Sequence, residues 1–242
     1  MSALLEVRNI SRSFRTTLAV NDVSFSVREG ELVGLMGPNG AGKSTLFNLI
    51  AGVLPPSAGE IVYDGRTVTG WKAHDMARVG IARTFQIPKP YRQLSVIENV
   101  MLSAFLREKS IVGARKVAAA TLDDVGLADF AESPASSLTV GLLKRLEVAR
   151  ALAMRPKLVL FDEIMAGLTP TEVGSMTSFV AQLPSRGITV IWVEHVLYAI
   201  MKTATRMIVI NRGKQIAEGT PAMMARDPAV VKAYLGEEIA IA

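Results

Sequence analysis

The sequence predicts an α/β fold in which a mainly parallel sheet is covered by helices, with a small antiparallel β subdomain and an inserted helical subdomain. Short apolar runs alternate with stretches of helical period, which favours a parallel sheet that is buried on both faces. The first thirty residues instead alternate apolar and polar side chains, as a half-exposed antiparallel sheet does. A third region carries helical periods that no convincing strand interrupts.

Five apolar runs rich in β-branched residues predict the strands of the parallel sheet, at 32–36, 81–85, 158–161, 189–193 and 207–210. The stretch 59–70 predicts an antiparallel hairpin that turns at Asp64 and Gly65, a dipeptide typical of tight turns. A helix is expected to begin after Thr169, because Pro170 then fills the first helical position and Glu172 the third.

The chain is expected to form a single domain, 1–242, built from two parts. Residues 1–86 and 155–242 are predicted to form the α/β core with its antiparallel β subdomain, and 87–154 the helical subdomain. Pro88 and Pro90 mark the entry to this insert. Along its last helix, the apolar positions expected to face the core are Leu142, Leu143, Leu146 and Ala149.

Composition limits the classes of protein to which the chain can belong. The 242 residues include no cysteine, which excludes disulfides and thiolate chemistry, and half of them are hydrophobic, so a sizeable core can be buried. No signal peptide is indicated at the start, and no apolar run reaches the ~18 residues that a membrane span needs. The net charge of +5 is scattered along the chain, which argues against a nucleic-acid partner. We therefore expect a soluble protein or one peripheral to a membrane.

A glycine-rich loop between a predicted strand and a predicted helix indicates a phosphate site. The pattern G-x-x-x-x-G-K-[ST] is filled by Gly37, Pro38, Asn39, Gly40, Ala41, Gly42, Lys43 and Ser44, with Thr45 next. Glycines let backbone N–H groups wrap a polyphosphate, and the following helix adds partial positive charge. Lys43 is expected to reach the β- and γ-phosphates, and the Ser44 hydroxyl to ligate Mg²⁺.

Polar residues also follow three other predicted strands. Asp162 and Glu163 come directly after the run 158–161, where Asp162 is expected to hold Mg²⁺ through water and Glu163 to act as a general base on an attacking water. Gln86 ends the run 81–85, and His195 follows the run 189–193. Because ligands of open parallel sheets bind beyond the carboxyl ends of the strands, these side chains are expected at one edge.

With its motifs in this order, the chain resembles an ATP-binding-cassette ATPase, a P-loop NTPase with a RecA-like core, over essentially its full length. GPNGAGKST resembles the Walker A motif, LVLFDE the Walker B motif and AGLTP the D-loop, while Gln86 and His195 resemble the Q-loop glutamine and the switch histidine. The resemblance implies ATP and Mg²⁺ as cofactors. It also implies a set of roles: Lys43, Gln86, Glu163 and His195 as catalytic residues, Ser44, Gln86 and Asp162 as metal residues, and Phe14 as the aromatic stacked on adenine.

The stretch SLTVG, 137–141, stands where that family carries its LSGGQ signature. Members of the family pair head to tail, so that each signature helix points at the ATP held by the other cassette. The resemblance implies that the hydroxyl of Thr139 and the backbone N–H of Gly141 contact a second subunit's ATP. Val140 and Leu142 depart from the signature, and Ile164 replaces the usual proline after the glutamate. We expect hydrolysis to survive these departures but to depend on a partner subunit.

Four stretches narrow the resemblance to the cassettes of high-affinity branched-chain amino acid importers: GIARTFQ, LSVIENV, KRLEVARAL and the tail GTPAMMARDPAVVKAYLGEE. This implies a second cassette, identical or paralogous, two membrane permease subunits and, indirectly, a periplasmic solute-binding protein. It places the chain at the cytoplasmic face of the inner membrane, with 86–100 as the expected contact with the membrane subunits. Two alternatives stay open: an exporter cassette for lipid or lipopolysaccharide, and a degenerate regulatory cassette with weak ATPase activity.

Overall fold

The computed structural model describes residues 3–235. The strands are β1 (Ala3–Phe14), β2 (Thr17–Arg28), β3 (Leu32–Met36), β4 (Ala58–Tyr63), β5 (Arg66–Thr67), β6 (Ile81–Arg83), β7 (Leu158–Asp162), β8 (Thr189–Val193), β9 (Arg206–Asn211) and β10 (Lys214–Gly219). The helices are α1 (Lys43–Ile50), α2 (Ala73–Val79), α3 (Val96–Ala104), α4 (Ile111–Asp124), α5 (Val140–Ala153), α6 (Pro170–Gln182), α7 (Leu197–Thr203), α8 (Pro221–Met224) and α9 (Pro228–Leu235), with short 3-10 turns η1 (Ala128–Phe130), η2 (Ala135–Ser137) and η3 (Pro184–Arg186). Positions 236–238 of the tail motif, and both ends of the predicted domain, lie outside the described residues.

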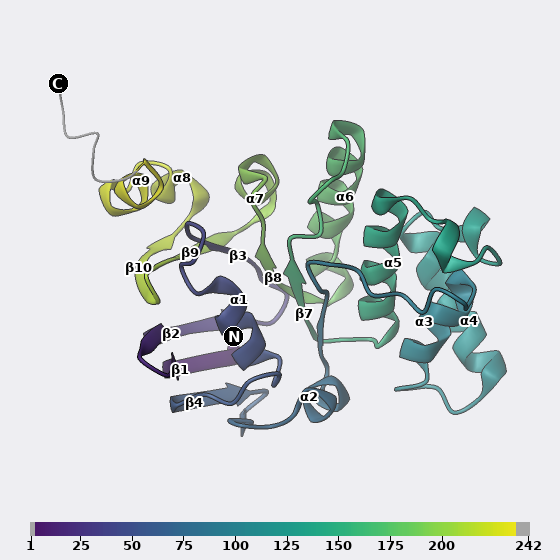
Figure 1. Ribbon diagram of the computed structural model, residues 1–242, viewed down its shortest axis with the longest axis horizontal. Helices are drawn as coiled ribbons and strands as arrows, with labels where there is room; N and C mark the ends of the chain where they lie inside the picture. The colour runs from purple at the N-terminus through teal and green to yellow at the C-terminus, as the bar shows by residue number, and fades with distance from the viewer. Residues whose placement is uncertain (1–2, 236–242) are drawn as a thin grey trace.

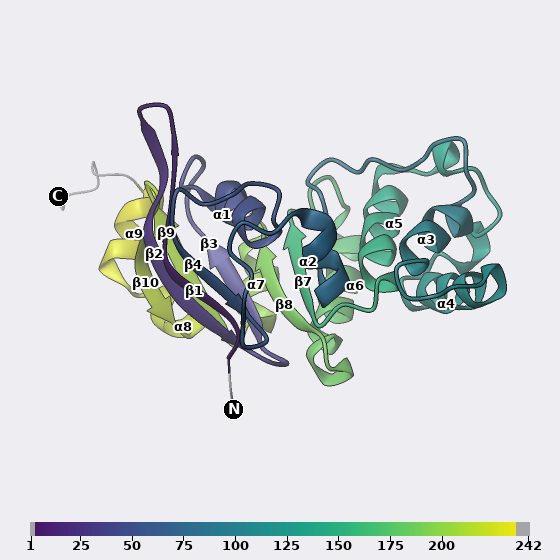
Figure 2. The same cartoon turned by 90° about the horizontal axis from the view of Figure 1, so that it is seen from below.

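Two sheets organise the described part of the chain. The central sheet has the strand order β10-β9-β3-β8-β7-β6, in which β10 pairs antiparallel with β9 and the other neighbours are parallel. The second sheet is antiparallel, with the order β2-β1-β4-β5. Figure 2 shows β1, β2 and β4 stacked beside the central sheet. The predicted α/β fold with an antiparallel β subdomain is therefore confirmed.

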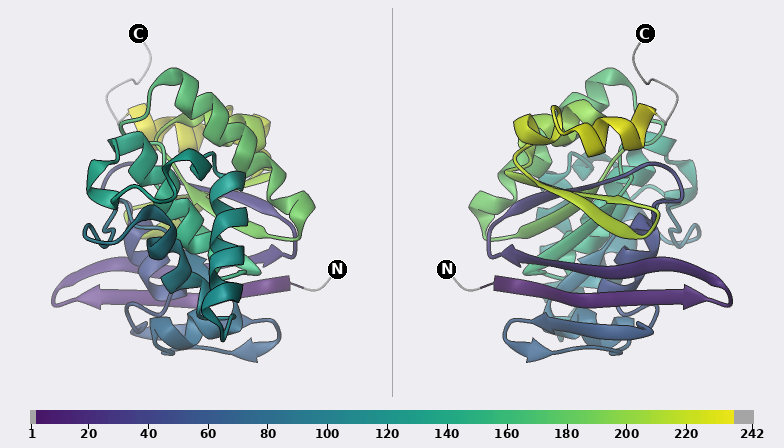
Figure 3. Two further views of the ribbon diagram at one scale, coloured as in Figure 1. Left: turned by 90° about the vertical axis from the view of Figure 1, so that its right-hand side faces the viewer. Right: turned by 90° about the vertical axis from the view of Figure 1, so that its left-hand side faces the viewer.

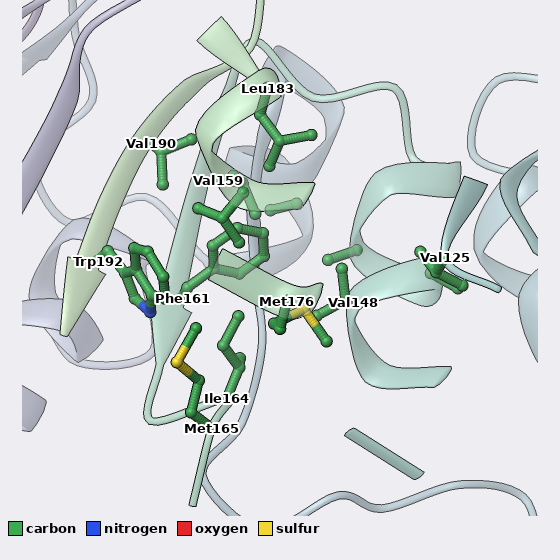
Figure 4. Close-up of a cluster of buried hydrophobic side chains, with 14 of the residues drawn as sticks. Val125, Val148, Val159, Phe161, Ile164, Met165, Met176, Leu183, Val190 and Trp192 are labelled. Atoms are coloured by element: carbon green, nitrogen blue, oxygen red, sulfur yellow. The ribbon is translucent and has the colours of Figure 1, made fainter. Parts of the chain in front are cut away.

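The parallel strands are buried on both faces because alternate side chains enter two different cores. On one face, Leu35 of β3 and Ile191 of β8 pack with Phe47 of α1 and with the antiparallel sheet. On the other face, Phe161 of β7 and Trp192 of β8 pack toward α5 and α6, as Figure 4 shows. This double burial explains why the strands appear in the sequence as continuous apolar runs.

Ile164 belongs to this second core, although it lies only one residue beyond Glu163. Its side chain is fully buried, and Figure 4 places it beside Met165 and below Phe161. Core packing thus accounts for an apolar residue at the position where the resemblance leads us to expect proline.

Most of the predicted element boundaries are confirmed, and one strand is shorter than predicted. The hairpin turns at Asp64 and Gly65, which both have positive φ (49° and 73°), and α6 begins with a capping box formed by Thr169 and Glu172. The run 81–85 forms a strand only as far as Arg83. After the amide of the next residue, Thr84, has donated to the sheet, the chain leaves it and Phe85 is exposed.

Residues 84–157 pass from β6 to β7 through α3, α4 and α5. Figure 1 and the left panel of Figure 3 show these helices gathered at one side of the molecule, beyond α6 and β7. On α5, Leu146 and Ala149 are buried as predicted, whereas Leu142 and Leu143 are only half-buried. None of the helices within residues 3–235 is long and apolar enough to cross a membrane.

Candidate nucleotide-binding site

The glycine-rich loop joins β3 to α1 and is fixed by backbone sterics. Gly37 and Gly42 have φ values of 152° and 104°, which side-chain-bearing residues rarely adopt. A Cβ on Gly37 would lie 2.1 Å from the Ile210 carbonyl oxygen, and one on Gly42 would lie 2.4 Å from that of Ala19. Glycine is therefore required at both positions, because strand β9 and the start of β2 leave no room.

Lys43 lies across this loop and is only 7% exposed. Its Nζ donates to the carbonyl oxygens of Gly37 at 2.7 Å and Pro38 at 3.0 Å. Burial lowers the pKa of Lys43, while the carboxylates of Glu163 and Asp162 act in the opposite direction. The ammonium group thus lies over the loop, where a bound polyphosphate would compete with the two carbonyl oxygens for its hydrogen bonds.

A cleft of about 260 Å³ opens over the loop and contains groups from three strand ends. It is lined by residues 39–45, Ala19, Gln86 and Glu163. Phe14, at the end of β1, is not among these lining residues; it is 41% exposed, and the Arg12 guanidinium lies 4.9 Å from its ring centroid.

Glu163 sits at the centre of a cluster of polar side chains. Gln86 Nε2 donates to Glu163 Oε2, and His195 Nε2 lies 2.9 Å from Glu163 Oε1. Glu163 has φ 49°, and its amide donates to the carbonyl of Val193 on the neighbouring strand. Backbone held in this sparsely populated region is common where side chains must be aimed at a site. The structure therefore brings together three residues that lie far apart in the sequence.

Asp162 ends β7 and is almost completely buried. Its Oδ2 lies 3.4 Å from an Arg83 guanidinium nitrogen, and Arg83 also donates to Asn48 on α1. Burial raises the pKa of Asp162, and the positive charge of Arg83 opposes that rise. Sequence reasoning missed Arg83, although an arginine inside the predicted strand 81–85 is itself a signal that a carboxylate lies nearby.

The residues assigned to Mg²⁺ suit a cation that keeps most of its own water. Ser44, exposed at the first turn of α1, and Gln86 both line the cleft, whereas the carboxylate of Asp162 is buried at the end of β7 and is not among the lining residues. Within residues 3–235, no group of three or more His, Cys, Asp or Glu side chains gathers as a metal cage. Mg²⁺ is usually held by one or two carboxylates together with substrate phosphates, so this donor set fits it.

Lys144 is a second residue that sequence reasoning missed. It lies on α5, is 3% exposed, and its Nζ donates to the carbonyl oxygen of Gln86 and, at 2.9 Å, to that of Glu163. Burial lowers its pKa against the attraction of nearby carboxylates, of which Glu194 is the strongest. The sequence contains a hint of this position, because Lys144 follows Gly141 by three residues and precedes Val148 by four, which places it on the same helix face as these two residues.

The groups at the N-terminus of α5 also have partners in the same chain. The Thr139 hydroxyl oxygen caps the helix by accepting from the amide of Leu142, so its proton remains available to donate. Gly141 is buried, and a Cβ there would lie 2.3 Å from Glu172 Oε1 on α6. Val140 is 57% exposed and projects at the start of the helix.

Comparisons with known proteins agree with this geometry. Residues 20–166 match the family model described as "ABC transporter", and residues 214–240 match one described as "Branched-chain amino acid ATP-binding cassette transporter". The chain is 36% identical to the high-affinity branched-chain amino acid transport ATP-binding protein BraF of Pseudomonas aeruginosa, over 97% of this chain and 98% of that protein. It is 34% identical to the lipopolysaccharide export system ATP-binding protein LptB of Acidithiobacillus ferridurans, over the full length of both.

Two solved structures extend the comparison to the fold. A nucleotide-free ATP-binding cassette from an ABC transporter superposes with a TM-score of 0.88 at 30% identity, covering 98% of this chain and 100% of that one. A dimeric ATP-binding cassette in a post-hydrolysis state, bound to ADP and phosphate, superposes with a TM-score of 0.83 at 26% identity, covering 90% and 98%.

Proposed function

The chain belongs to the ABC transporter ATPases, and we propose that it hydrolyses Mg-ATP in a head-to-tail pair of cassettes to drive solute import. The cargo we propose is a branched-chain amino acid or a related amino acid, amide or small organic solute. The observation that carries the proposal is the contact of Gln86 and His195 with the two oxygens of Glu163, which also lines the cleft over the glycine loop.

In this proposal Glu163 is the general base. Its carboxylate takes a proton from water as the water oxygen bonds to the γ-phosphorus and the bond to the ADP oxygen breaks. Gln86 and His195 orient the carboxylate through their contacts with its two oxygens. Lys43 leaves the loop carbonyls to reach the β- and γ-phosphates. Ser44, Asp162 and Gln86 would hold Mg²⁺, which supplies charge neutralisation at the phosphates.

A second cassette completes the site in this proposal. Thr139 offers a hydroxyl proton at an exposed helix N-terminus, where an anion from another molecule is favoured. The helical subdomain 87–154 would then move with respect to the core formed by 1–86 and 155–242. The solved cassette dimer with ADP and phosphate supports a paired arrangement, because it superposes on this chain.

Coupling to two membrane permease subunits is proposed through the loop that follows Gln86, with the chain peripheral at the cytoplasmic face of the inner membrane. Ile87 and Tyr91 are more than half exposed there. Asn99, which is fully buried, fixes the loop by exchanging hydrogen bonds with the Tyr91 backbone. A rigid loop that exposes apolar side chains suits the docking of a partner helix.

Replacing Tyr91 by Asp should therefore abolish transport while Mg-ATP binding stays intact. Tyr198→Asp, which changes an equally exposed tyrosine on α7, is the matched control and should leave transport nearly unchanged. A parallel loss of transport and ATP binding in the Tyr91 variant would count against the coupling assignment.

An exporter cassette for lipid or lipopolysaccharide is the second candidate, favoured by the full-length similarity to LptB. The direction is tested by reconstituting the chain into proteoliposomes with the membrane subunits encoded beside it. ATP-dependent uptake of labelled leucine that requires a solute-binding protein supports import, and release of lipopolysaccharide from the vesicles supports export. If the assembled complex shows no ATPase activity above that of a Glu163→Gln variant, the degenerate regulatory cassette is the correct reading.

A further inference from the structure

The C-terminal segment reaches the phosphate loop through one side chain. Tyr234 lies near the end of α9, in the region that matches the branched-chain cassette model and outside the match to the general ABC transporter model. Its hydroxyl oxygen accepts a hydrogen bond of 2.8 Å from the amide of Gly37, the first glycine of the loop. Figure 1 shows α8 and α9 lying together beside β9 and β10.

Gly37 is therefore held from two directions. Its N–H donates to Tyr234, and its carbonyl oxygen accepts from Lys43 Nζ at 2.7 Å. Further along the loop, the carbonyl of Ala41 accepts from the amide of Gly213, in the turn between β9 and β10. Two of these three supports come from the part of the chain that follows β8, which is remote in sequence from the loop.

The support from Lys43 is weakened when a nucleotide binds, if the proposed function is correct. Lys43 Nζ has three N–H donors, so reaching both the β- and the γ-phosphate leaves it at most one of its two hydrogen bonds to the carbonyls of Gly37 and Pro38. The hydrogen bond from Gly37 to Tyr234 does not compete with the nucleotide, because Gly37 is not among the residues that line the cleft over the loop. Its contribution to the shape of the loop is therefore larger in the nucleotide-bound protein than in the free protein.

We propose that Tyr234 is a positioning residue for the phosphate loop, which it holds in the nucleotide-binding shape after Lys43 has moved to the phosphates. The inference rests on the proposed function, since it takes the loop as the ATP site. The ring itself borders an apolar cleft of about 350 Å³ formed with α7 and α8, a role that phenylalanine would fill equally well. The hydroxyl is what the loop requires, and because burial raises the pKa of Tyr234 it stays a neutral acceptor.

Tyr234→Phe in the full chain tests this directly, because it keeps the ring and removes the acceptor. The dissociation constant of a Mg²⁺-bound non-hydrolysable ATP analogue, measured by calorimetry, should rise about fivefold, the ratio that one ordinary hydrogen bond represents. In the assembled transporter, KM for ATP should rise by a similar factor while kcat changes less than about twofold. Tyr198→Phe is the matched control and should change neither constant, because the Tyr198 hydroxyl accepts a hydrogen bond from Lys202 on its own helix.

The wild-type chain provides a second test that does not depend on a variant. With the analogue bound, the Gly37 amide should exchange with solvent slowly, and an unprotected Gly37 amide would overturn the proposal. So would an unchanged dissociation constant in Tyr234→Phe, or a fall in kcat and melting temperature with KM unchanged. Lys43→Ala distinguishes a failure of the proposed function from a failure of this inference. If Lys43→Ala binds the analogue as tightly as wild type, the proposed function itself is wrong. If Lys43→Ala loses binding while Tyr234→Phe binds as tightly as wild type, only the inference about Tyr234 is wrong.

Discussion

The carboxyl edge of the central sheet and the N-terminus of α5, the two regions to which the proposed function assigns the nucleotide contacts, are organised very differently. At the sheet edge, Gln86, Glu163 and His195 contact one another within one molecule. At the start of α5, Thr139 caps its own helix and Gly141 is covered by Glu172. The groups at the sheet edge are in contact before any ligand arrives, whereas at the start of α5 Thr139 and Val140 are exposed.

In the proposed head-to-tail pair, this difference identifies the half of the site that depends on a second molecule. The side chains of a preassembled cluster are already ordered, so the free energy of ligand binding is not reduced by the entropic cost of ordering them. In the proposed function, the start of α5 must still meet a second molecule. The two halves are nevertheless linked, because the loop 163–169 runs from Glu163 to the N-cap of α6, where Glu172 covers Gly141.

The largest effect is expected from Glu163→Gln, which keeps the shape of the sheet-edge cluster and removes its base. ATP hydrolysis in the assembled transporter should fall by at least about 100-fold, in line with the contribution of a general base. Binding of Mg-ATP should be retained, because the loop and Lys43 are untouched. Phosphate release and calorimetric binding together check this. If the rate of ATP hydrolysis stayed within about twofold of wild type, Glu163 would not be the general base.

A smaller effect is expected from Lys144→Met, which cuts the link between α5 and the sheet edge. The carbonyls of Gln86 and Glu163 lose their shared donor, so the free energy of unfolding should fall by about 1–3 kcal/mol. ATPase activity should fall about tenfold, because both residues lose their common anchor. Lys116→Met, at an exposed position of α4, is the matched control. Equal activities of the two variants would show that the edge is positioned without α5.

Gly141→Ala tests the covered state of the α5 N-terminus. The new methyl group would collide with Glu172, so the free energy of unfolding should fall by about 1–3 kcal/mol. Gly174→Ala is the matched control on α6, where a Cβ meets nothing within 4 Å and should stabilise the helix by up to about 1 kcal/mol. Denaturant unfolding measures both, and adding Glu172→Ala to the first variant should restore part of the loss. If Gly141→Ala behaves like the control, the contact with Glu172 does not constrain this helix.

The same contrast separates what the sequence could predict from what it could not. Gly37, Asp162 and His195 follow strands of a parallel sheet, so topology alone places them at one edge. The strand at 81–85 was predicted two residues too long, because the apolar Phe85 extends the pattern although it lies outside the sheet. The contacts of Arg83, Lys144 and Tyr234 depend on how segments that are remote in the sequence pack together, so they cannot be predicted from local residue spacing. The sequence predicts Glu172 as a capping residue of α6. It does not predict that the same side chain also covers Gly141, because that contact depends on how α5 and α6 pack.

The smallest effect is expected from Glu194→Gln, which probes the loop that joins the two halves. Glu194 is buried beside His195, and its Oε1 accepts the amide of Met165 in that loop. Burial raises the pKa of Glu194 above its usual value, and the neighbouring charge of Glu163 adds to the rise.

The sign of the pH dependence follows from this raised pKa. The folded protein holds the Glu194 proton more tightly than the unfolded chain, so the stability that this group contributes is present at acidic pH and is lost as pH rises through the folded pKa. Glutamine keeps the acceptor for Met165 and cannot ionise. Glu194→Gln should therefore match wild type in denaturant unfolding at pH values below the usual pKa of a glutamate, and exceed it, by less than about 1 kcal/mol, at mildly alkaline pH. A variant that is less stable than wild type by the same amount at every pH would show that Glu194 acts through its shape and contacts alone. The loop between the sheet edge and α6 would then be anchored independently of charge.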